Sequence, residues 1–491
     1  MKTRRHPSNK PRKRKRRTRR KDEAAPTPLP PPGDDGIPRR TFLQITAAAA
    51  GAAVLGPTAC TGKMGIRGLD GDVQEGPDLP PDDGAVEAEG PADVPGDPDA
   101  DADVPPDEQD VTAEDAPTDA DDAPEELPDI SLHVFVARNG TPVENVQNVI
   151  RLAGGIERFV GPGDAVVLKP NGQWPLQGYT NTECLKALID VILARPGGFG
   201  GEVIIAEHVH RSPDEAMTGD YCWNISAGWN RTNNWPDMSY LELVDAYHAG
   251  GTLNVTAVPL YDQSADPDNW QVVAGPGELE AGKHGWVRST YTTEANGNTV
   301  RLSYPILRSA FSGRLIDLRG GVWDGGAYTG DRVRIIFLPT LNNHNGFNSE
   351  DYAGPTSAVK CHLGIVEFAG DEGVSLHDIG YGANDPLAAG EAIGHLITRV
   401  ITPTFYMTCA EYTGYRGRTD SEAAHTRTVG LSLDPVTLDF WMCKYVMYPC
   451  ATSQEFMNPD NDNNLRRQLI GCNGRGVGTL DEAAITVHET G

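Results

Sequence analysis

The sequence predicts an α/β protein whose mostly parallel sheet is flanked by helices. Short, entirely apolar runs such as Ala165–Leu168 (AVVL) and Val203–Ala206 (VIIA) alternate with amphipathic stretches such as Thr182–Ala194. Strands covered on both faces by helices have this continuous apolar character, because neither face meets water. The pattern occupies residues 129–491, a body of about 360 residues, which is long enough for one large domain or two fused ones.

The expected elements follow in chain order. Apolar runs predict strands at Leu132–Ala137, Ala165–Leu168, Val203–Ala206, Val333–Leu338, Phe405–Ala410 and Thr428–Leu433. Apolar residues at helical spacing predict helices at Val143–Leu152, Thr182–Ala194, Pro386–Val400 and Val436–Val446. Residues 222–330 are different, being rich in Trp, Gly and Asn, with a hairpin signal at Asn296-Gly297-Asn298. We interpret them as an insertion or subdomain beside the sheet.

Charge is distributed very unevenly along the chain. Residues 1–21 hold 13 Lys or Arg, residues 65–130 hold 24 Asp or Glu with one base, and residues 131–491 hold 41 acidic and 25 basic side chains. The basic cluster lies in an extreme tail without apolar periodicity, so it is not the face of a nucleic-acid-binding domain. An acidic body is also a poor partner for polyanions, because binding nucleic acid requires neutralisation of its phosphates.

The first 60 residues are typical of an export signal. Arg39-Arg40 is followed by an uncharged apolar run, Ile45–Leu55, as in signals for the twin-arginine export machinery. This run is shorter than the roughly 20 residues that a membrane span requires. The alternative is an ordinary Ala-rich helix after a basic tail. The first interpretation places the mature protein in the periplasm or cell envelope.

The signal ends in Pro57-Thr58-Ala59-Cys60, which is similar to a lipoprotein processing site with Cys60 as the lipidated residue. Such sites usually have Leu where this chain has Pro57, so plain cleavage or an uncleaved anchor remains an alternative. The acidic Pro/Asp/Ala-rich residues 61–128 hold too little apolar surface to offset the entropy of folding. We expect a disordered linker that holds the body away from a membrane.

The chain has eight cysteines, and no two have C-x-x-C spacing. The sequence therefore contains neither a zinc-ribbon pattern nor a ferredoxin-type cluster motif, and it leaves the disulfide pairing open.

In α/β sheets, ligands bind beyond the carboxyl ends of the strands, so residues that follow predicted strands are site candidates. Lys169 and Asn171 follow the AVVL run and could hold a carboxylate or phosphate, the alternative being a surface lysine at a turn. Glu207, His208 and His210 follow the VIIA run. They could ligate a metal ion if the segment is extended, the alternative being a solvated loop.

Two further candidates follow later strands. The segment Asn342–Gly346 brings Asn343 and His344, and a helix-like stretch then presents Thr356 and Lys360 on one face. Asp434 precedes Pro435 at the start of a predicted helix, so it is expected to cap that helix or to bind ligand.

These segments, in this order, resemble the family catalogued as domain of unknown function 362. The matching residues are Val167–Asn171, Thr180–Thr182, Asn342–His344, Thr356–Gly364 and Ser432–Asp439, within a resemblance that spans roughly 131–450. The chain has Asn342 where the family usually has Lys, and Cys361 where it usually has Asn. Some members carry iron–sulfur clusters on an added ferredoxin segment, which this sequence does not contain.

Two functional hypotheses follow. In the first, the protein is an enzyme or binding protein for a small anionic ligand. Lys169 and Lys360 orient the ligand, His344 serves as general base or metal ligand, and Asp439 orients His344 or Lys360. In the second, it is a non-catalytic lipoprotein that binds glycan or peptide on aromatic side chains. The tryptophans considered for that surface are Trp223, Trp229, Trp235, Trp270, Trp286 and Trp323.

Overall fold

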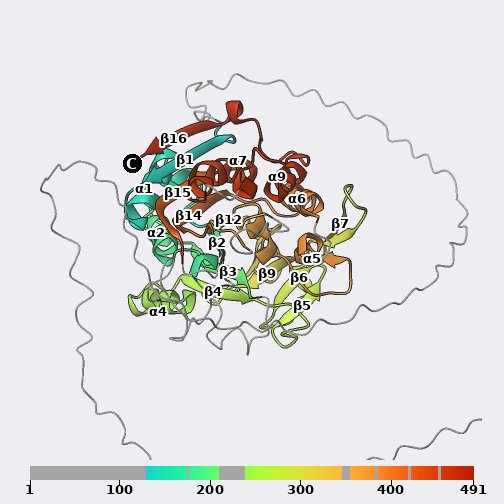
Figure 1. Cartoon of the computed structure of the whole chain (residues 1–491). Helices are drawn as coiled ribbons and strands as arrows, with labels where there is room; N and C mark the ends of the chain where they lie inside the picture. Colours follow the sequence, from blue (N-terminus) through green and yellow to red (C-terminus); the bar gives the residue numbers. More distant parts are fainter. Residues whose placement is uncertain are drawn as a thin grey trace, which may run out of the picture. The chain divides into compact units, whose positions relative to one another are not determined.

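The computed structural model describes the folded body of the chain (Figure 1). The described residues are 129–172, 174, 176–209, 238–344, 354–381, 385–418, 422–451 and 455–491. The predictions for the export signal, Cys60 and the acidic linker lie outside the described residues, as do those for His210, Trp223, Trp229 and Trp235.

An eight-stranded, mostly parallel sheet forms the centre of the body and confirms the predicted fold class. In spatial order its strands are β16 (Thr486–Thr490), β1 (His133–Arg138), β15 (Ala424–Ser432), β14 (Phe405–Thr413), β12 (Val333–Leu338), β2 (Ala165–Pro170), β3 (Glu202–His208) and β4 (Val255–Leu260). Strand β15 is antiparallel to both of its neighbours, and the other adjacent pairs are parallel. Every residue of β2 and β3 is buried.

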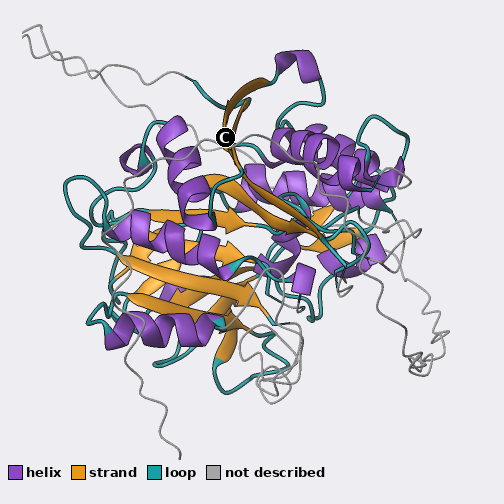
Figure 2. Cartoon of the chain, turned by 60° about the vertical axis from the view of Figure 1, so that its left-hand side comes forward, coloured by secondary structure: helices purple, strands orange, loops and turns teal. Residues whose placement is uncertain are grey.

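Helices cover both faces of this sheet (Figure 2). The α-helices of the described residues are α1 (Pro142–Leu152), α2 (Thr182–Leu193), α4 (Tyr240–Ala249), α5 (Leu376–Tyr381), α6 (Pro386–His395), α7 (Pro435–Met442), α8 (Tyr448–Cys450) and α9 (Asn464–Asn473). The local sequence fixes where several of these helices begin. Thr141 and Glu144 form a capping box on α1, and Asn181 accepts a hydrogen bond from the backbone N–H of Cys184 at the start of α2.

Two predicted helices are shorter than the sequence pattern indicates. Beyond α6 and α7 the chain continues as π-helical turns, Leu396–Val400 and Cys443–Met447. Several strands are longer than predicted. Among them, β2 includes Lys169, and β3 includes both Glu207 and His208. The alternatives of a surface lysine and a solvated loop at these places are wrong, because all three side chains are buried.

The described part of residues 222–330 contributes to three sheets. Helix α4 and strand β4 belong to the main sheet, where β4 pairs with β3. A second, five-stranded sheet follows, with the order β11 (Gly321–Trp323), β10 (Leu315–Asp317), β9 (Tyr304–Arg308), β6 (His284–Val287) and β5 (Trp270–Val273). The predicted hairpin is present as β7 (Thr290–Thr292) and β8 (Thr299–Arg301), which join β13 (Val374–Ser375) in a three-stranded sheet.

The strand order fixes where a site can form. From β2 the chain proceeds to β3 and β4 on one side, and it then returns to β12 on the other side of β2. Such a reversal opens a crevice between neighbouring strands at their carboxyl ends. Asn171 bridges this point, because its side-chain oxygen accepts a hydrogen bond from the Thr340 backbone N–H, 3.0 Å away, just after β12.

Candidate functional site

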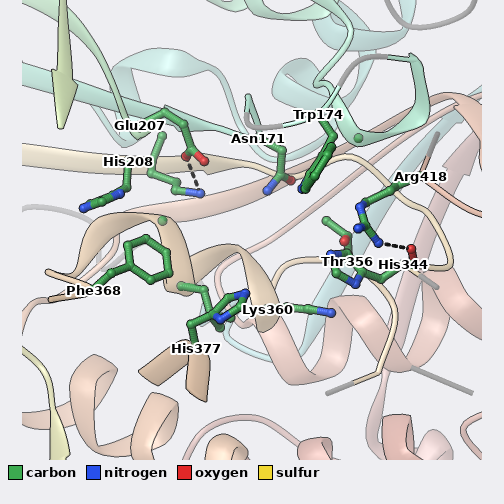
Figure 3. Close-up of a pocket in the computed structure, with 14 residues that line it drawn as sticks. Asn171, Trp174, Glu207, His208, His344, Thr356, Lys360, Phe368, His377 and Arg418 are labelled. Atoms are coloured by element: carbon green, nitrogen blue, oxygen red, sulfur yellow. Dashed lines mark hydrogen bonds and ion pairs between the residues drawn. The ribbon is translucent and has the colours of Figure 1, made fainter. Parts of the chain in front are cut away.

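A cavity opens at the carboxyl ends of β2, β3 and β12 (Figure 3). It encloses about 560 Å³ of empty space, including the part that opens to solvent. Its lining combines predicted and unpredicted residues: Lys169, Asn171, Trp174, Gly178, Glu207, His208, His344, Thr356, Lys360, Leu363, Gly364, Phe368, His377 and Arg418. The structure thus brings together six of the predicted candidates: Lys169, Asn171, Glu207, His208, His344 and Lys360.

A buried ion pair between Lys169 and Glu207 lies at the base of the cavity. The Lys169 Nζ and Glu207 Oε2 atoms are 2.6 Å apart, and their side chains are 1% and 5% exposed. Burial raises the pKa of Glu207 to about 7, although Lys169 opposes this rise. Burial by itself would lower the pKa of Lys169, but the neighbouring Cys361 and Glu207 groups outweigh it and raise that pKa.

Close packing encloses this pair. Lys169 Nζ is 3.3 Å from the Sγ atom of Cys361, a buried thiol whose pKa is raised to about 12 by burial. The backbone of Gly364 covers the other side, since a Cβ atom there would lie 2.5 Å from Lys169 Nζ and 2.7 Å from Glu207 Oε2. Only a glycine allows this approach. Cys361 and Gly364 are therefore both in direct contact with the pair.

Beside this pair, His208 is held by a second carboxylate. Its Nε2 atom is 3.1 Å from Asp262 Oδ1, and its ring packs edge-on against Phe368 with centroids 4.3 Å apart. Burial lowers the pKa of His208, with Asp262 opposing the change. Asp262 also accepts a hydrogen bond from the Phe368 backbone N–H at 2.7 Å. Asp262 thereby holds both the His208 ring and the backbone at Phe368 in place.

Lys360 and Thr356 reach the cavity from a segment that Asp439 organises. Lys360 begins a 3₁₀-helix, Lys360–Ile365, whereas Thr356 lies before it in a β-bridge with Asn342. The prediction that the two share one helical face is therefore wrong, although both line the cavity. Lys360 is 6% exposed, and its ammonium donates a hydrogen bond to the Gly354 carbonyl at 3.1 Å.

Asp439 acts on the backbone of this segment. Its carboxylate accepts hydrogen bonds from the Ser357 hydroxyl at 2.7 Å and from the backbone N–H groups of Ala358 and Val359 at 2.7 and 2.8 Å. Burial raises the pKa of Asp439 to about 7. Instead of contacting His344 or Lys360 as predicted, Asp439 holds the turn from which Lys360 projects.

Arg418, Trp174 and His344 lie on the far side of the cavity from Glu207 and His208, and Lys360 lies between the two groups (Figure 3). The Arg418 guanidinium stacks over the Trp174 ring, with Cζ 4.4 Å from the ring centroid, and donates a hydrogen bond to the His344 carbonyl. The stack orients a cation that is only partly buried.

The other predicted residues lie outside the cavity lining. Asp434 caps α7 as expected, accepting a hydrogen bond from the Thr437 backbone N–H at 2.7 Å, and burial raises its pKa to about 6. Asn343 is buried, and its backbone N–H donates a hydrogen bond to the Gly414 carbonyl at 2.7 Å.

Within the described part of the chain, no three His, Cys, Asp or Glu side chains converge to hold a metal ion. Glu207 and His208 instead pair with Lys169 and Asp262.

Some cavity residues were not selected from the sequence. Trp174 and Arg418 come from loops that follow β2 and β14, so a consistent application of the strand-end rule would have included them. Asp262 follows β4 in the same way, but its strand was assigned to the insertion. His377 lies in α5, and Phe368 lies between the 3₁₀-helix and β13, so neither carries such a signal.

Comparisons with models of protein families, with curated proteins and with solved structures found no match for this chain. The resemblance to the family of domain of unknown function 362 therefore stays a prediction. Among the residues that the structure describes, no helix is long and apolar enough to cross a membrane. The six described cysteines, at 184, 361, 409, 443, 450 and 472, are free.

Proposed function

We propose that this chain binds a small anionic compound, a carboxylate or phosphate, in the cavity at the carboxyl ends of β2, β3 and β12. The charge of the lining carries the proposal. Among the described residues of the lining, three have cationic side chains, Lys169, Lys360 and Arg418, and one has a carboxylate, Glu207, which is paired with Lys169. Cationic side chains in the lining favour a negatively charged ligand, although the body as a whole is acidic. Hydrogen bonds between groups of opposite charge are stronger than those between neutral groups.

Glu207 is the group in this cavity best suited to exchange a proton with a bound anion. A carboxyl with a pKa of about 7 is present in both protonation states near neutral pH, which is the condition for general acid–base catalysis. Lys360 and Arg418 can then orient the anionic end of the ligand, and Asp439 acts as a positioning residue through the turn before Lys360.

A binding panel tests this function. Purified full-length protein is titrated calorimetrically with inorganic phosphate, phosphonoacetate, malate and citrate. We expect Lys360→Met to weaken the best ligand by about tenfold or more, since a hydrogen bond to a charged group contributes about 1.5–3 kcal/mol. Lys186→Met, at an exposed lysine on α2, is the matched control and should bind like the unmodified chain. Failure of all four anions to bind, or equal binding by both variants, would contradict the proposal.

We also propose that the chain is exported through the twin-arginine machinery and anchored by lipid at Cys60. The support is the Arg39-Arg40 pair, the apolar run after it and the small residue before Cys60. Globomycin, which blocks lipoprotein signal cleavage, should cause a precursor to accumulate, as should Cys60→Ser. Normal processing under both conditions would argue against lipidation, and unchanged export of an Arg39→Lys/Arg40→Lys variant would argue against the route.

The glycan- or peptide-binding alternative receives no support from the described tryptophans. Trp270 and Trp286 are 1% and 0% exposed, and they stack on each other in the core with ring centroids 5.1 Å apart. Trp323 is partly buried and packs edge-on against Tyr328.

A further inference from the structure

A second, larger groove lies at the amino ends of β12 and β14, whereas the cavity proposed to bind an anion lies at the carboxyl ends of the strands. It encloses about 1440 Å³ of empty space, including the part open to solvent. Its lining includes four arginines, Arg158, Arg319, Arg332 and Arg334, and apolar residues such as Phe159, Leu318, Val333 and Val400. We call this surface the arginine groove.

Two arginines of the groove, Arg332 and Arg334, share one carboxylate. Asp164 is shared, with its oxygens 3.3 Å from Arg332 Nε and 2.9 Å from Arg334 Nε. Asp331 pairs instead with Arg314, at 2.7 Å. The side chain of Arg332 remains 59% exposed. A concentration of arginines on the surface of an acidic body is suited to bind an extended acidic segment.

The topology places the entry of the acidic linker at the same edge of the sheet. Strands β1 and β12 run in the same direction, because β12 is parallel to β14 and both β14 and β1 are antiparallel to β15. Val333, the first residue of β12, lines the groove. The chain enters β1 at His133, four positions after Asp129, so the linker joins the body at this edge.

Arg158 connects the groove with that entry point. The pKa of Asp129 is lowered, first by hydrogen bonds from Ser131 and then by the charges of His133 and Arg158. Arg158 is therefore near enough to the start of the described chain for their charges to interact. The ten residues immediately upstream, 119–128 (DADDAPEELP), carry five carboxylates and no base. Fully extended, ten residues span up to about 35 Å, which is ample to follow a groove.

We propose that the acidic segment 119–128 of this same chain docks in the arginine groove. Its carboxylates pair with the arginines of the groove. This inference is independent of the proposed ligand.

Carbodiimide cross-linking in the full-length protein tests the docking. The reagent joins carboxylates to amines, so Arg319→Lys places a reactive amine in the groove. Arg151→Lys, on the exposed side of α1 and outside the groove, is the control for simple tethering. At low salt we expect links from position 319 to residues 119–128 to exceed those from position 151 by about tenfold. This excess should disappear in about 0.5 M salt, where charges are screened beyond a few ångströms.

Two further measurements complete the test. Adding Arg158→Gln and Arg332→Gln to the Arg319→Lys chain should lower the yield at position 319, with an unchanged melting temperature showing that the fold is intact. Mixing isotope-labelled and unlabelled chains identifies the partner molecule. Equal yields at positions 319 and 151, links unaffected by the groove substitutions, or links mainly between different molecules would each overturn the proposal.

Discussion

The buried Lys169–Glu207 pair gives the sharpest prediction about stability. Glu207→Gln keeps the shape of the side chain but leaves the Lys169 ammonium, 1% exposed, without its carboxylate 2.6 Å away. The remaining neighbour is the Cys361 thiol at 3.3 Å, a weak acceptor. Breaking one side of a buried pair typically costs about 3–5 kcal/mol, because an uncompensated charge remains in a low-dielectric site. We expect a loss in that range from the free energy of unfolding.

The double variant Lys169→Met/Glu207→Gln removes both charges, so it should recover most of that loss. Urea denaturation of the full-length chain at pH 8 measures the four members of the cycle, with unchanged m-values as the check on two-state behaviour. Lys186 and Asp190 form a pair with the same 2.6 Å separation, but their side chains are 52% and 48% exposed. Asp190→Asn should therefore cost less than about 1 kcal/mol. The reasoning is refuted if Glu207→Gln costs no more than Asp190→Asn, or if the double variant loses as much as the two single variants together.

Two other predictions concern Asp439 and a close helix contact. Burial raises the pKa of Asp439 to about 7, so the folded chain retains a proton that the unfolded chain releases near its ordinary pKa of about 3.9. This contribution to stability is complete below about pH 4 and is lost as the pH rises through about 7. Between pH 4 and 7, this group should make the free energy of unfolding fall by up to about 1.4 kcal/mol per pH unit. Asp439→Asn should remove that fall from a series of urea denaturations at different pH values. An unchanged dependence on pH would contradict the assignment. Separately, a Cβ at Gly390 in α6 would lie 1.9 Å from the Gln468 carbonyl oxygen in α9. Gly390→Ala should destabilise the chain by about 1–3 kcal/mol or more, whereas Gly275→Ala, with nothing within 4 Å, should cost less than about 0.5 kcal/mol in the same urea assay; equal effects would refute the contact.

Much of the fold could be predicted because its signals are local. An apolar run such as Ala165–Leu168 has to be buried on both faces, wherever the rest of the chain lies. The cap at Asp434 follows from neighbouring residues alone, and the structure confirms it. The division of residues 222–330 could not be predicted in this way. Strand β4 resembles its neighbours in composition, and only its pairing with β3 assigns it to the main sheet.

The candidate site was predictable in part for the same reason. The strand-end rule selected Lys169, Glu207 and Lys360, because each belongs to or follows an element with a clear pattern. It did not reveal that Lys169 and Glu207 pair with each other. That contact requires β2 and β3 to be neighbours and Gly364 to cover them from a segment far along the chain.

By itself, the sequence determined the α/β class, most strands of the main sheet, four of the described helices, and the ends of the strands at which a site should lie. The tertiary structure alone decided which polar side chains meet there. It paired Lys169 with Glu207 and His208 with Asp262, turned Asp439 toward the backbone before Lys360, and brought Arg418 over Trp174. The physical reason is that secondary structure follows from periodicity within one segment. The partner of a buried charge is instead fixed by strand order and packing between segments that local sequence does not connect.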